Sequence, residues 1–403
     1  MKAPIPINGS TWWIGVNDRE TDLFESIWPL PRGVSYNSYL LADEKVAVVD
    51  TVKSSAFDAY LAKIRRVLGP ERTVDYVVIN HMEPDHSGSL RLLREVFPHA
   101  QLVGSKKTIE FLGHLYGITD NTRIVGHGDE LDLGDSGGHT LRFALTPMVH
   151  WPETMMTYDT AHQILFSGDA FGGFGALDGG IFDDEVDVDY FDDEILRYFS
   201  NIVGKYCPMV QRALAKLQGT PIKVVAPTHG PVWRADPGRI LGAYDRWSRY
   251  EADDGVVLAY ASMYGNTTSM MESVAKGLLD AGFPTVRVHD ASRTHVSYIV
   301  RDAWRYKGII LGSPTYDTGL FPPMANLVNL LAEKKLKGRI LGVFGSYGWS
   351  GGGVKALTEF AAQGDYNLLE PVVEARFAPT PTDIEACRLL GRTMAERIRA
   401  ASA

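Results

Sequence analysis

The sequence predicts an α/β protein in which a layered sandwich of strands and helices is followed by a doubly wound parallel sheet. Its 403 residues exceed one ordinary domain and suggest two or three. Short β-rich runs alternate with helical stretches, which is typical of layered α/β or α+β folds. The polar stretch Glu251–Gly255 separates two differently patterned halves, so we expect domains at residues 1–250 and 251–403.

The composition excludes several classes of protein. The chain is 45% hydrophobic and 22% charged, which excludes disorder, collagen and coiled coil. It contains no apolar run of the roughly 18 residues that a membrane span needs, and residues 1–13 do not resemble a secretory signal. Cys207 and Cys387 are the only cysteines, so a disulfide framework and a cysteine-rich metal site are excluded and a cytoplasmic protein is expected.

The net charge of −9 lies entirely in the first half, because residues 251–403 carry 16 basic and 16 acidic side chains. This distribution argues against nucleic-acid binding, which needs a basic face. The excess of acid has two interpretations: it serves solubility, or it belongs to a site that is rich in carboxylates.

The two halves differ in how their expected elements alternate. In the first half we expect strands at Tyr36–Leu41, Val46–Asp50, Val74–Asn80, Thr140–Leu145, Gln163–Phe166 and Ile222–Ala226, with helices such as Ser54–Leu68 and Lys106–Leu115. In the second half we expect strands at Val256–Ala261, Thr285–His289, Gly308–Leu311, Ile340–Phe344 and near Glu370–Ala375, and helices at Thr267–Ala281, Met324–Lys334, Val354–Gln363 and from Pro381. Five short apolar strands that alternate with helices indicate a doubly wound, five-stranded parallel sheet.

The densest group of metal-binding residue types follows the third expected strand, where His81, Glu83, Asp85 and His86 lie within six residues. Side chains at i and i+2 of an extended segment point the same way, so His81 and Glu83 are expected to reach one ion. Pro84 then turns the chain, and Asp85 faces a second ion.

Three more candidate ligands, His150, Asp169 and His229, each follow another expected strand. Strand ends that deliver imidazole and carboxylate to one edge of a sandwich provide the rigid positions that a metal site requires. A set of imidazoles and carboxylates without thiolate suits iron or manganese better than structural zinc, and a carboxylate such as Asp169 can bridge two ions. A lone histidine after a strand is usually an ordinary loop residue, and we interpret five others in that way: His99, His114, His127, His139 and His162.

The order His-x-Glu-x-Asp-His, with a later His, Asp and His, resembles the metallo-β-lactamase fold and, more closely, the flavodiiron proteins (A-type flavoproteins). Hydrolases of that fold usually have histidine at the position of Glu83. The resemblance implies an αββα sandwich that holds two irons. One iron would be bound by His81, Glu83 and His150, the other by Asp85 and His229, and both by Asp169. His86 is a ligand in some members of the family and turns away in others.

A second candidate site comprises three loops in the second half, each at the carboxyl end of an expected strand, where doubly wound sheets bind ligands. The first loop opens a helix, whose N-terminal N–H groups favour an anion. Each loop alone could be an ordinary capped helix or Gly-rich turn. The candidate residues are Ser262, Met263, Tyr264, Gly265, Asn266 and Thr267, then Ser313, Pro314, Thr315, Tyr316, Asp317 and Gly319, and finally Ser346, Tyr347, Gly348, Trp349, Ser350 and Gly351.

The three loops together resemble flavodoxin and imply a site for flavin mononucleotide (FMN). Tyr316 and Trp349 are expected to flank the flavin ring by stacking. No second phosphate site and no acidic residue for a ribose stand out, which favours FMN over FAD.

The resemblance covers nearly the whole chain and implies a flavodiiron reductase of O2 to water, of NO to nitrous oxide, or of both, which protects anaerobes from these gases. Electrons would pass from an external donor through FMN to the two irons. Two cysteines cannot supply the four thiolates of a rubredoxin-type iron, so the donor is expected to be a separate molecule: rubredoxin, a reductase or reduced deazaflavin. In this family a head-to-tail dimer places the FMN of one subunit beside the irons of the other, so we expect a homodimer, and a tetramer of two dimers stays open.

Many members of the family carry a Tyr-Tyr pair where this chain has Tyr198-Phe199. A hydroxyl there can hydrogen-bond the gas, so Tyr198 is the expected catalytic residue, and Phe199 lies where the second hydroxyl would be. Trp151, next to His150, is either a pocket wall or a buried structural side chain. The acidic run Asp183–Glu194 is interpreted as a solvated loop and helix start, with a docking surface for a redox partner as the weaker alternative.

Two other hypotheses stay open. The first is a metal hydrolase of the lactamase fold with a flavodoxin domain in another role, and Glu83 argues against it. The second is an electron carrier or binding module with a vestigial metal site, and the complete ligand set argues against that. Iron and FMN in a two-to-one ratio would support only the flavodiiron reductase.

Overall fold

The computed structural model describes residues 3–136 and 138–402, which divide into two compact units. Unit 1 comprises residues up to Phe199 and Tyr206–Asp245, and unit 2 comprises Ser200–Lys205 and residues from Arg246 onward. The sequence predicted one domain boundary, after residue 250. It did not predict that the short segment Ser200–Lys205, which lies earlier in the chain, belongs to unit 2. Among the described residues, no helix is both long enough and apolar enough to cross a membrane.

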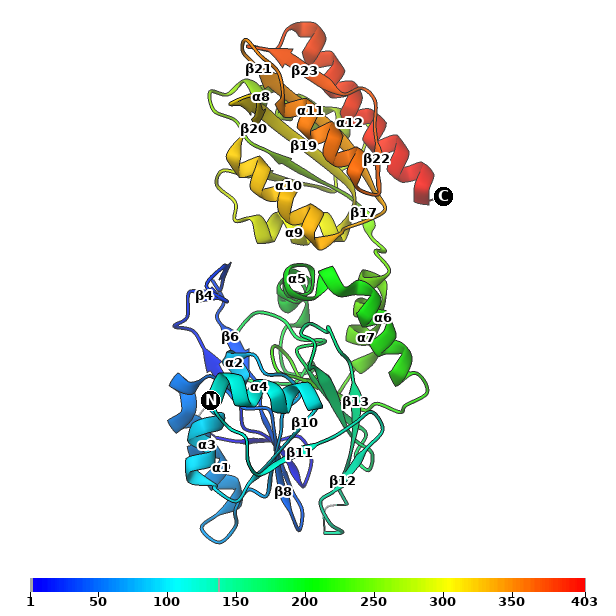
Figure 1. Cartoon of the computed structure of the whole chain (residues 1–403). Coiled ribbons are helices and arrows are strands. Elements are labelled where there is room, and N and C mark those ends of the chain that lie inside the picture. The colour runs from blue at the N-terminus through cyan, green and yellow to red at the C-terminus, as the bar shows by residue number, and fades with distance from the viewer. Residues whose placement is uncertain (1–2, 137, 403) are drawn as a thin grey trace. The chain divides into compact units, whose positions relative to one another are not determined.

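Two sheets pack face to face in unit 1 (Figure 1). The first contains, in spatial order, β1 (Ile5–Pro6), β2 (Thr11–Trp13), β7 (Tyr39–Ala42), β8 (Val46–Val49), β9 (Tyr76–Val78), β10 (Gln101–Gly104) and β11 (Thr122–Ile124). The second contains β12 (Glu130–Asp132), β13 (Thr140–Leu145), β14 (Met155–Asp159), β15 (Ile164–Gly168) and β16 (Val224–Pro227). The ring of Tyr39 lies 5.1 Å from that of Phe166, and the Tyr39 hydroxyl donates to the carbonyl of Pro227 at 2.6 Å, so side chains from both sheets form one core.

Helices cover the two sheets and make the four layers that the resemblance predicted. Figure 1 shows α1 and α3 beside the first sheet and α6 and α7 on the side of the second. The helices are α1 (Phe57–Leu68), α2 (Pro84–Ser87), α3 (Leu90–Val96), α4 (Lys106–Tyr116), α5 (Val188–Tyr198), α6 (Cys207–Leu217) and α7 (Pro237–Ser248). In α1, Phe57, Tyr60, Ile64 and Leu68 recur every three or four residues and are buried, as expected of an amphipathic helix on a sheet. The αββα sandwich is confirmed.

Smaller elements complete unit 1. They are the two-stranded ribbons β3 (Val16–Asp18) with β6 (Val34–Tyr36) and β4 (Leu23–Phe24) with β5 (Trp28–Pro29), and the helical turn Ser54–Ala56. Two further turns, Phe199–Val203 and Gly204–Tyr206, follow α5 and lie mostly in unit 2. The turn Phe199–Val203 is a π-helix. It continues directly from α5, and most of it belongs to unit 2.

Strand directions in unit 1 bring several strand ends to one edge. In the second sheet, β13 and β15 both run antiparallel to β14, and β15 is parallel to β16, so β13, β15 and β16 end on the same side. In the first sheet, β9 lies parallel between β8 and β10. Asn80, just past β9, donates to the carbonyl of Phe166 at 3.3 Å and accepts from the hydroxyl of Thr157 at 2.7 Å. The carboxyl end of β9 therefore faces those of the second sheet.

Unit 2 is the doubly wound parallel sheet that the sequence predicted. Its strand order is β18 (Val286–Asp290), β17 (Asp253–Tyr260), β19 (Tyr306–Tyr316), β21 (Arg339–Tyr347) and β22 (Tyr366–Leu368), all parallel. β23 (Val373–Arg376) also pairs with β21, and β20 (Gly319–Leu320) pairs with β19. The strand expected near Glu370–Ala375 corresponds to β23, which begins only after Pro371, a residue without an N–H to donate. The sequence did not predict β22.

The helices that connect these strands are α8 (Asn266–Asp280), α9 (Val296–Arg305), α10 (Pro322–Lys334) and α11 (Gly353–Gln363), and α12 (Pro381–Ser402) follows the last strand. Met270 of α8 and Leu390 of α12 share one buried core with Val256 and Ile310 of the sheet. On this scaffold the loops after β17, β19 and β21 all leave the same edge of the sheet.

Candidate metal centre and flavin pocket

Four loops of unit 1 converge on one buried cluster. The first follows β9 and continues into the one-turn helix α2, which begins at Pro84, where a missing N–H costs nothing. The turn that the sequence predicted at Pro84 is therefore a turn of helix. The other three loops follow β13, β15 and β16. Together they assemble all seven predicted ligands: His81, Glu83, Asp85, His86, His150, Asp169 and His229.

The first group of ligands is His81, Glu83, His150 and Asp169, whose candidate ligand atoms all lie within 4.8 Å of one another. His150 Nε2 lies 3.2 Å from Glu83 Oε2 and 3.1 Å from Asp169 Oδ2. His81 Nε2 lies 3.5 Å and 3.7 Å from the same two oxygens. Two imidazole nitrogens and two carboxylate oxygens thus face one point.

The second group is Asp85, His86 and His229. His229 Nε2 lies 3.3 Å from Asp85 Oδ2, and His86 Nε2 lies 3.6 Å from Asp85 Oδ1. Asp169 Oδ1 faces this group, at 3.0 Å from His86 Nε2 and 3.5 Å from His229 Nε2, whereas its Oδ2 faces the first group. The Asp169 carboxylate therefore lies between two metal-sized positions.

Several atoms of the cluster are buried without a hydrogen-bond partner, as expected of atoms arranged for metal ions. They are His81 Nε2, both carboxylate oxygens of Asp85, both ring nitrogens of His86 and His229 Nε2. Each buried polar atom without a hydrogen-bond partner destabilises the folded protein by about 1–3 kcal/mol. Several such atoms in one place therefore indicate a binding site rather than a contribution to stability. Because nitrogen and oxygen ligands without thiolate suit iron, the residues fit two iron ions.

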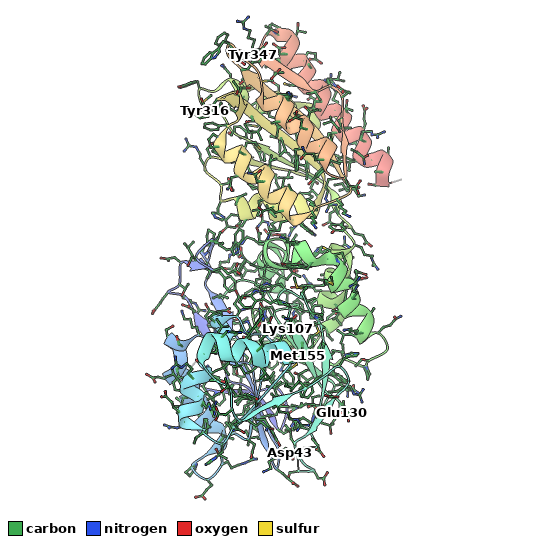
Figure 2. All side chains as sticks on the ribbon, in the orientation of Figure 1. Asp43, Lys107, Glu130, Met155, Tyr316 and Tyr347 are labelled. Atoms are coloured by element: carbon green, nitrogen blue, oxygen red, sulfur yellow. The ribbon has the colours of Figure 1, made fainter. Side chains whose placement is uncertain are left out.

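A third cluster, made by His139, Asp159 and His162, differs from the two ligand groups because its facing atoms have hydrogen-bond partners. His139 Nδ1 lies 2.7 Å and His162 Nδ1 3.0 Å from Asp159 Oδ2, and His139 Nε2 lies 2.8 Å from the Ser10 hydroxyl. None of these atoms is among the unsatisfied atoms of the described residues. The cluster lies at the end of β14 opposite Met155, which is labelled in Figure 2. It is a satisfied hydrogen-bond network, which agrees with the interpretation of His139 and His162 as ordinary loop residues.

The electrostatics of the ligand cluster favour cations. Burial alone would lower the pKa of His86 and of His150, but neighbouring carboxylates raise the first to about 9 and the second to about 8. Burial alone would raise the pKa of Asp169, yet His86 and His81 hold it well below its usual range. Protons thus gather on the imidazoles because the carboxylates create a negative potential, and the same potential attracts a divalent ion.

The hydroxyl of Tyr198 points into the cluster, and Phe199 does not. Tyr198, the last residue of α5, donates to Asp169 Oδ2 at 2.8 Å, and Thr228 donates to Asp169 Oδ1 at 2.5 Å. The Phe199 ring packs edge-on against Tyr244, with ring centroids 4.9 Å apart. The Asp169 carboxylate, which lies between the two groups, is therefore held by a hydroxyl on each side.

Sequence reasoning missed Glu153, which lies behind His81. Glu153 Oε1 is 2.6 Å from His81 Nδ1 and accepts from the backbone N–H of Met82 at 2.9 Å. The only available signal was its place three residues after His150, and carboxylates in loops are too common for that to identify it. His229 is held differently, by the backbone carbonyl of Ser35 at 2.8 Å from its Nδ1.

Trp151 borders the metal cluster. Its ring centroid lies 5.1 Å from that of His81, edge-on, and 6.3 Å from that of His150.

The acidic run Asp183–Glu194 is largely paired with arginines. Arg234 contacts Asp184 and Glu185, and Arg239 contacts Asp189 and Asp192. These pairs, and the start of α5 at Val188, favour the loop and helix-start interpretation over a docking surface.

A pocket of about 470 Å³ opens in unit 2 at the carboxyl ends of β17, β19 and β21. Gly265 has φ +93°, a conformation that glycine adopts without strain, and leads into the N-terminus of α8. The hydroxyls of Thr267 and Ser346 are 2.9 Å apart and join two of the loops. Figure 2 labels Tyr316 and Tyr347, which both line the pocket.

Most of the predicted flavin residues line this pocket. They are Ser262, Met263, Tyr264, Asn266, Thr267, Pro314, Thr315, Tyr316, Asp317, Ser346, Tyr347, Gly348, Trp349 and Ser350. Gly265, Ser313, Gly319 and Gly351 shape the loops without lining the pocket; for example, the Ser313 hydroxyl accepts from the N–H of Phe321 at 3.3 Å. The prediction missed Thr318 and Phe377. Phe377 follows β23, far along the chain from the three loops.

The pocket suits a flat aromatic ligand with an anionic end. Tyr316 and Trp349, the two residues that were expected to stack on the flavin, both line the pocket and are 44% and 89% exposed, so their rings are accessible to a ligand. A helix N-terminus with neighbouring hydroxyls suits a phosphate. The residues therefore fit FMN.

Two family models match the chain, one for each unit. The model described as ODP family beta lactamase matches residues 34–230, and the flavodoxin model matches residues 258–391. A nitric oxide reductase of Moorella thermoacetica is 32% identical over 403 residues, which is 99% of this chain and 100% of the relative.

Two solved structures are similar along nearly the whole chain. The rubredoxin:oxygen oxidoreductase of Desulfovibrio gigas has a TM-score of 0.93 at 29% identity and covers 99% of this chain and 100% of its own. The flavodiiron protein of Giardia intestinalis has a TM-score of 0.92 at 29% identity and covers 98% of this chain and 97% of its own. With a two-group metal cluster and a flavodoxin-type pocket in one polypeptide, the chain belongs to the flavodiiron protein family.

Proposed function

We propose that this protein is an FMN- and diiron-dependent oxidoreductase that reduces O2 to water, NO to nitrous oxide, or both, and so detoxifies these gases. The observation that carries the proposal is the pairing of two sites in one chain: a buried imidazole–carboxylate cluster with Asp169 between its halves, and a flavin pocket. The relatives named nitric oxide reductase and rubredoxin:oxygen oxidoreductase support both gases as substrates.

The proposed ligands of the two irons follow the two groups of the cluster. His81, Glu83 and His150 would hold one iron, Asp85 and His229 the other, and Asp169 would bridge them. His86 Nε2 lies 3.6 Å from Asp85 Oδ1 and 3.0 Å from Asp169 Oδ1, and His86 would be a further ligand of the second iron. When bound, the irons supply electrons to the gas, and FMN replenishes those electrons from outside.

The chain's own residues would orient the reacting groups and exclude water. Tyr198 keeps its O–H at Asp169, which places a proton donor at the edge of the cluster. Phe24 packs edge-on against His229, with ring centroids 5.6 Å apart, and Trp151 packs against His81 at 5.1 Å. These two apolar walls favour a small uncharged gas over larger polar substrates.

We further propose how electrons arrive. The described cysteines, Cys207 and Cys387, are both buried and belong to different units. We propose that the electron donor is a rubredoxin, a reductase or a reduced deazaflavin. A head-to-tail homodimer would pair the flavin of one chain with the irons of its partner. Domains at residues 1–250 and 251–403 and a cytoplasmic location complete the proposal.

Metal and flavin analysis tests the proposal against a hydrolase of the same fold. The purified protein, loaded anaerobically with Fe2+ and FMN, is expected to retain two irons and one FMN per chain. Retention of zinc in preference to iron, with no gas consumption by the reduced protein, would contradict the proposal.

A further inference from the structure

The two metal positions differ in what lies behind their imidazoles. In the first group, His81 Nδ1 lies 2.6 Å from a carboxylate oxygen, Glu153 Oε1. Glu153 is only 1% exposed, so its charge acts in a medium of low polarity. The same oxygen accepts from the backbone N–H of Met82. An ionised carboxylate only accepts hydrogen bonds, so His81 Nδ1 is the donor to Glu153. The lone pair of His81 is then on Nε2, which faces Glu83 and Asp169.

The loop that carries Glu153 is itself fixed. The Ser105 hydroxyl donates to the Glu153 carbonyl at 2.9 Å, and Trp151 from the same loop packs edge-on against the His81 ring at 5.1 Å. One loop thus provides a ligand, His150, and the support of a second ligand.

In the second group, no carboxylate of the described residues hydrogen-bonds the Nδ1 atom of either histidine. His229 Nδ1 is held by a neutral carbonyl, that of Ser35, at 2.8 Å. His86 Nδ1 is buried without a hydrogen-bond partner. A carboxylate behind a ligating imidazole raises the basicity of that ligand, and its removal typically costs 10–100-fold in metal affinity.

We infer that Glu153 is a positioning residue that makes the first metal position bind iron more tightly, and hold ferric iron more readily, than the second. The inference rests on the proposed function, since it assumes that iron occupies both positions. The inference concerns the iron affinity and the redox potential of the metal centre rather than gas reduction. An experiment can therefore contradict the inference without contradicting the proposed function.

The test is anaerobic equilibrium dialysis of the FMN-loaded, metal-free protein against Fe2+, with bound iron measured at each concentration. The wild type is expected to bind two Fe2+ in two unequal steps. Glu153→Gln keeps an oxygen acceptor but removes the charge, and it should weaken the tighter step by about 10–100-fold while leaving the weaker step unchanged. Glu153→Asp restores the charge and should recover part of the loss. Glu130→Gln removes an exposed charge from the same unit and should change neither step.

A redox titration of the iron-loaded proteins, followed by EPR, gives a reading that a merely structural role would not change. Loss of the Glu153 charge should raise the midpoint potential of the iron centre, because ferric iron loses electrostatic support. Unchanged steps and potential in Glu153→Gln, or a loss confined to the weaker step, would overturn the inference and leave the proposed function standing. A wild type that binds no Fe2+ would overturn both. FMN content and thermal unfolding of the metal-free variants confirm that they are folded.

Discussion

Asp169 is the residue on which both metal positions depend. Its Oδ2 faces His150 at 3.1 Å and its Oδ1 faces His86 at 3.0 Å. Hydroxyls of Tyr198 and Thr228 hold the two oxygens. A side chain that contacts both groups cannot be removed without loss to each.

Asp169→Ala is expected to abolish iron binding and gas reduction while FMN stays bound. The variant removes the shared carboxylate and leaves unpaired imidazoles, so activity should fall by at least about 100-fold. His81→Ala should behave similarly. Iron content, the flavin absorption and gas consumption measure the three properties, with His114→Ala on the exposed side of α4 as control. Sustained turnover in both ligand variants would show that the metal assignment is wrong.

Tyr198→Phe is expected to keep both irons and to reduce the rate of gas reduction by about tenfold. It removes one charge-assisted hydrogen bond to Asp169, and about 1.4 kcal/mol corresponds to a factor of ten. Steady-state rates at constant iron content measure the effect. Tyr190→Phe, an exposed tyrosine on the same helix, is the matched control. Equal rates in Tyr198→Phe and the wild type would remove Tyr198 from the mechanism.

At the scale of elements, the strand ends explain why the site was predictable. Strands with continuous apolar runs, such as β8 and β17, are covered on both faces and can be recognised from the sequence. Residues that can bind a metal or a phosphate are easy to recognise when they follow such strands. In this way the sequence predicted His150 as a metal ligand and the loop after β17 as part of the flavin site. The seven candidate ligands were identified because four of them form one dense motif after β9 and the other three follow β13, β15 and β16.

Other features left too weak a signal in the sequence. The strands β1 to β5 are two or three residues long and depend on pairing with distant segments. Glu153 and Phe377 reach their sites only through the fold, from segments that carry no motif of their own. Phe199 faces Tyr244 rather than the metal cluster because the chain leaves α5 in a π-helical turn. No local pattern in the sequence predicts that turn.

The loop between β17 and α8 offers a test at this scale. Gly265 has φ +93°, so Gly265→Ala should strain the loop by about 1–2 kcal/mol and weaken FMN binding by about tenfold. Quenching of flavin fluorescence measures the affinity. Gly69→Ala introduces a similar strain at φ +68° in unit 1 and should leave FMN binding unchanged. Equal affinities in Gly265→Ala and the wild type would contradict the assigned phosphate loop.

For the whole molecule, the proposal joins two sites that belong to different compact units. Neither site alone needs the other: a hydrolase needs no flavin, and a flavodoxin needs no metal cluster. Their presence in one chain makes sense if electrons pass between them, and a head-to-tail dimer supplies the route that we propose.

A mixing experiment tests that dimer. Asp169→Ala lacks the irons, and Ser262→Asp places a negative charge where the flavin phosphate is expected. Each variant alone should be inactive. Subunit exchange should restore roughly a quarter of wild-type activity, because half of the dimers are mixed and each contains one complete pair of sites. No recovery, with mixed dimers present by mass spectrometry, would show that each chain works alone.

The most direct test of the central claim is a pair of electrode assays on the reduced protein that contains two irons and one FMN per chain, one assay with O2 and one with NO. We predict rapid consumption of at least one gas, with nitrous oxide formed from NO or with O2 consumed without release of peroxide. If neither gas is consumed although iron and FMN are both present, the protein is not a gas reductase.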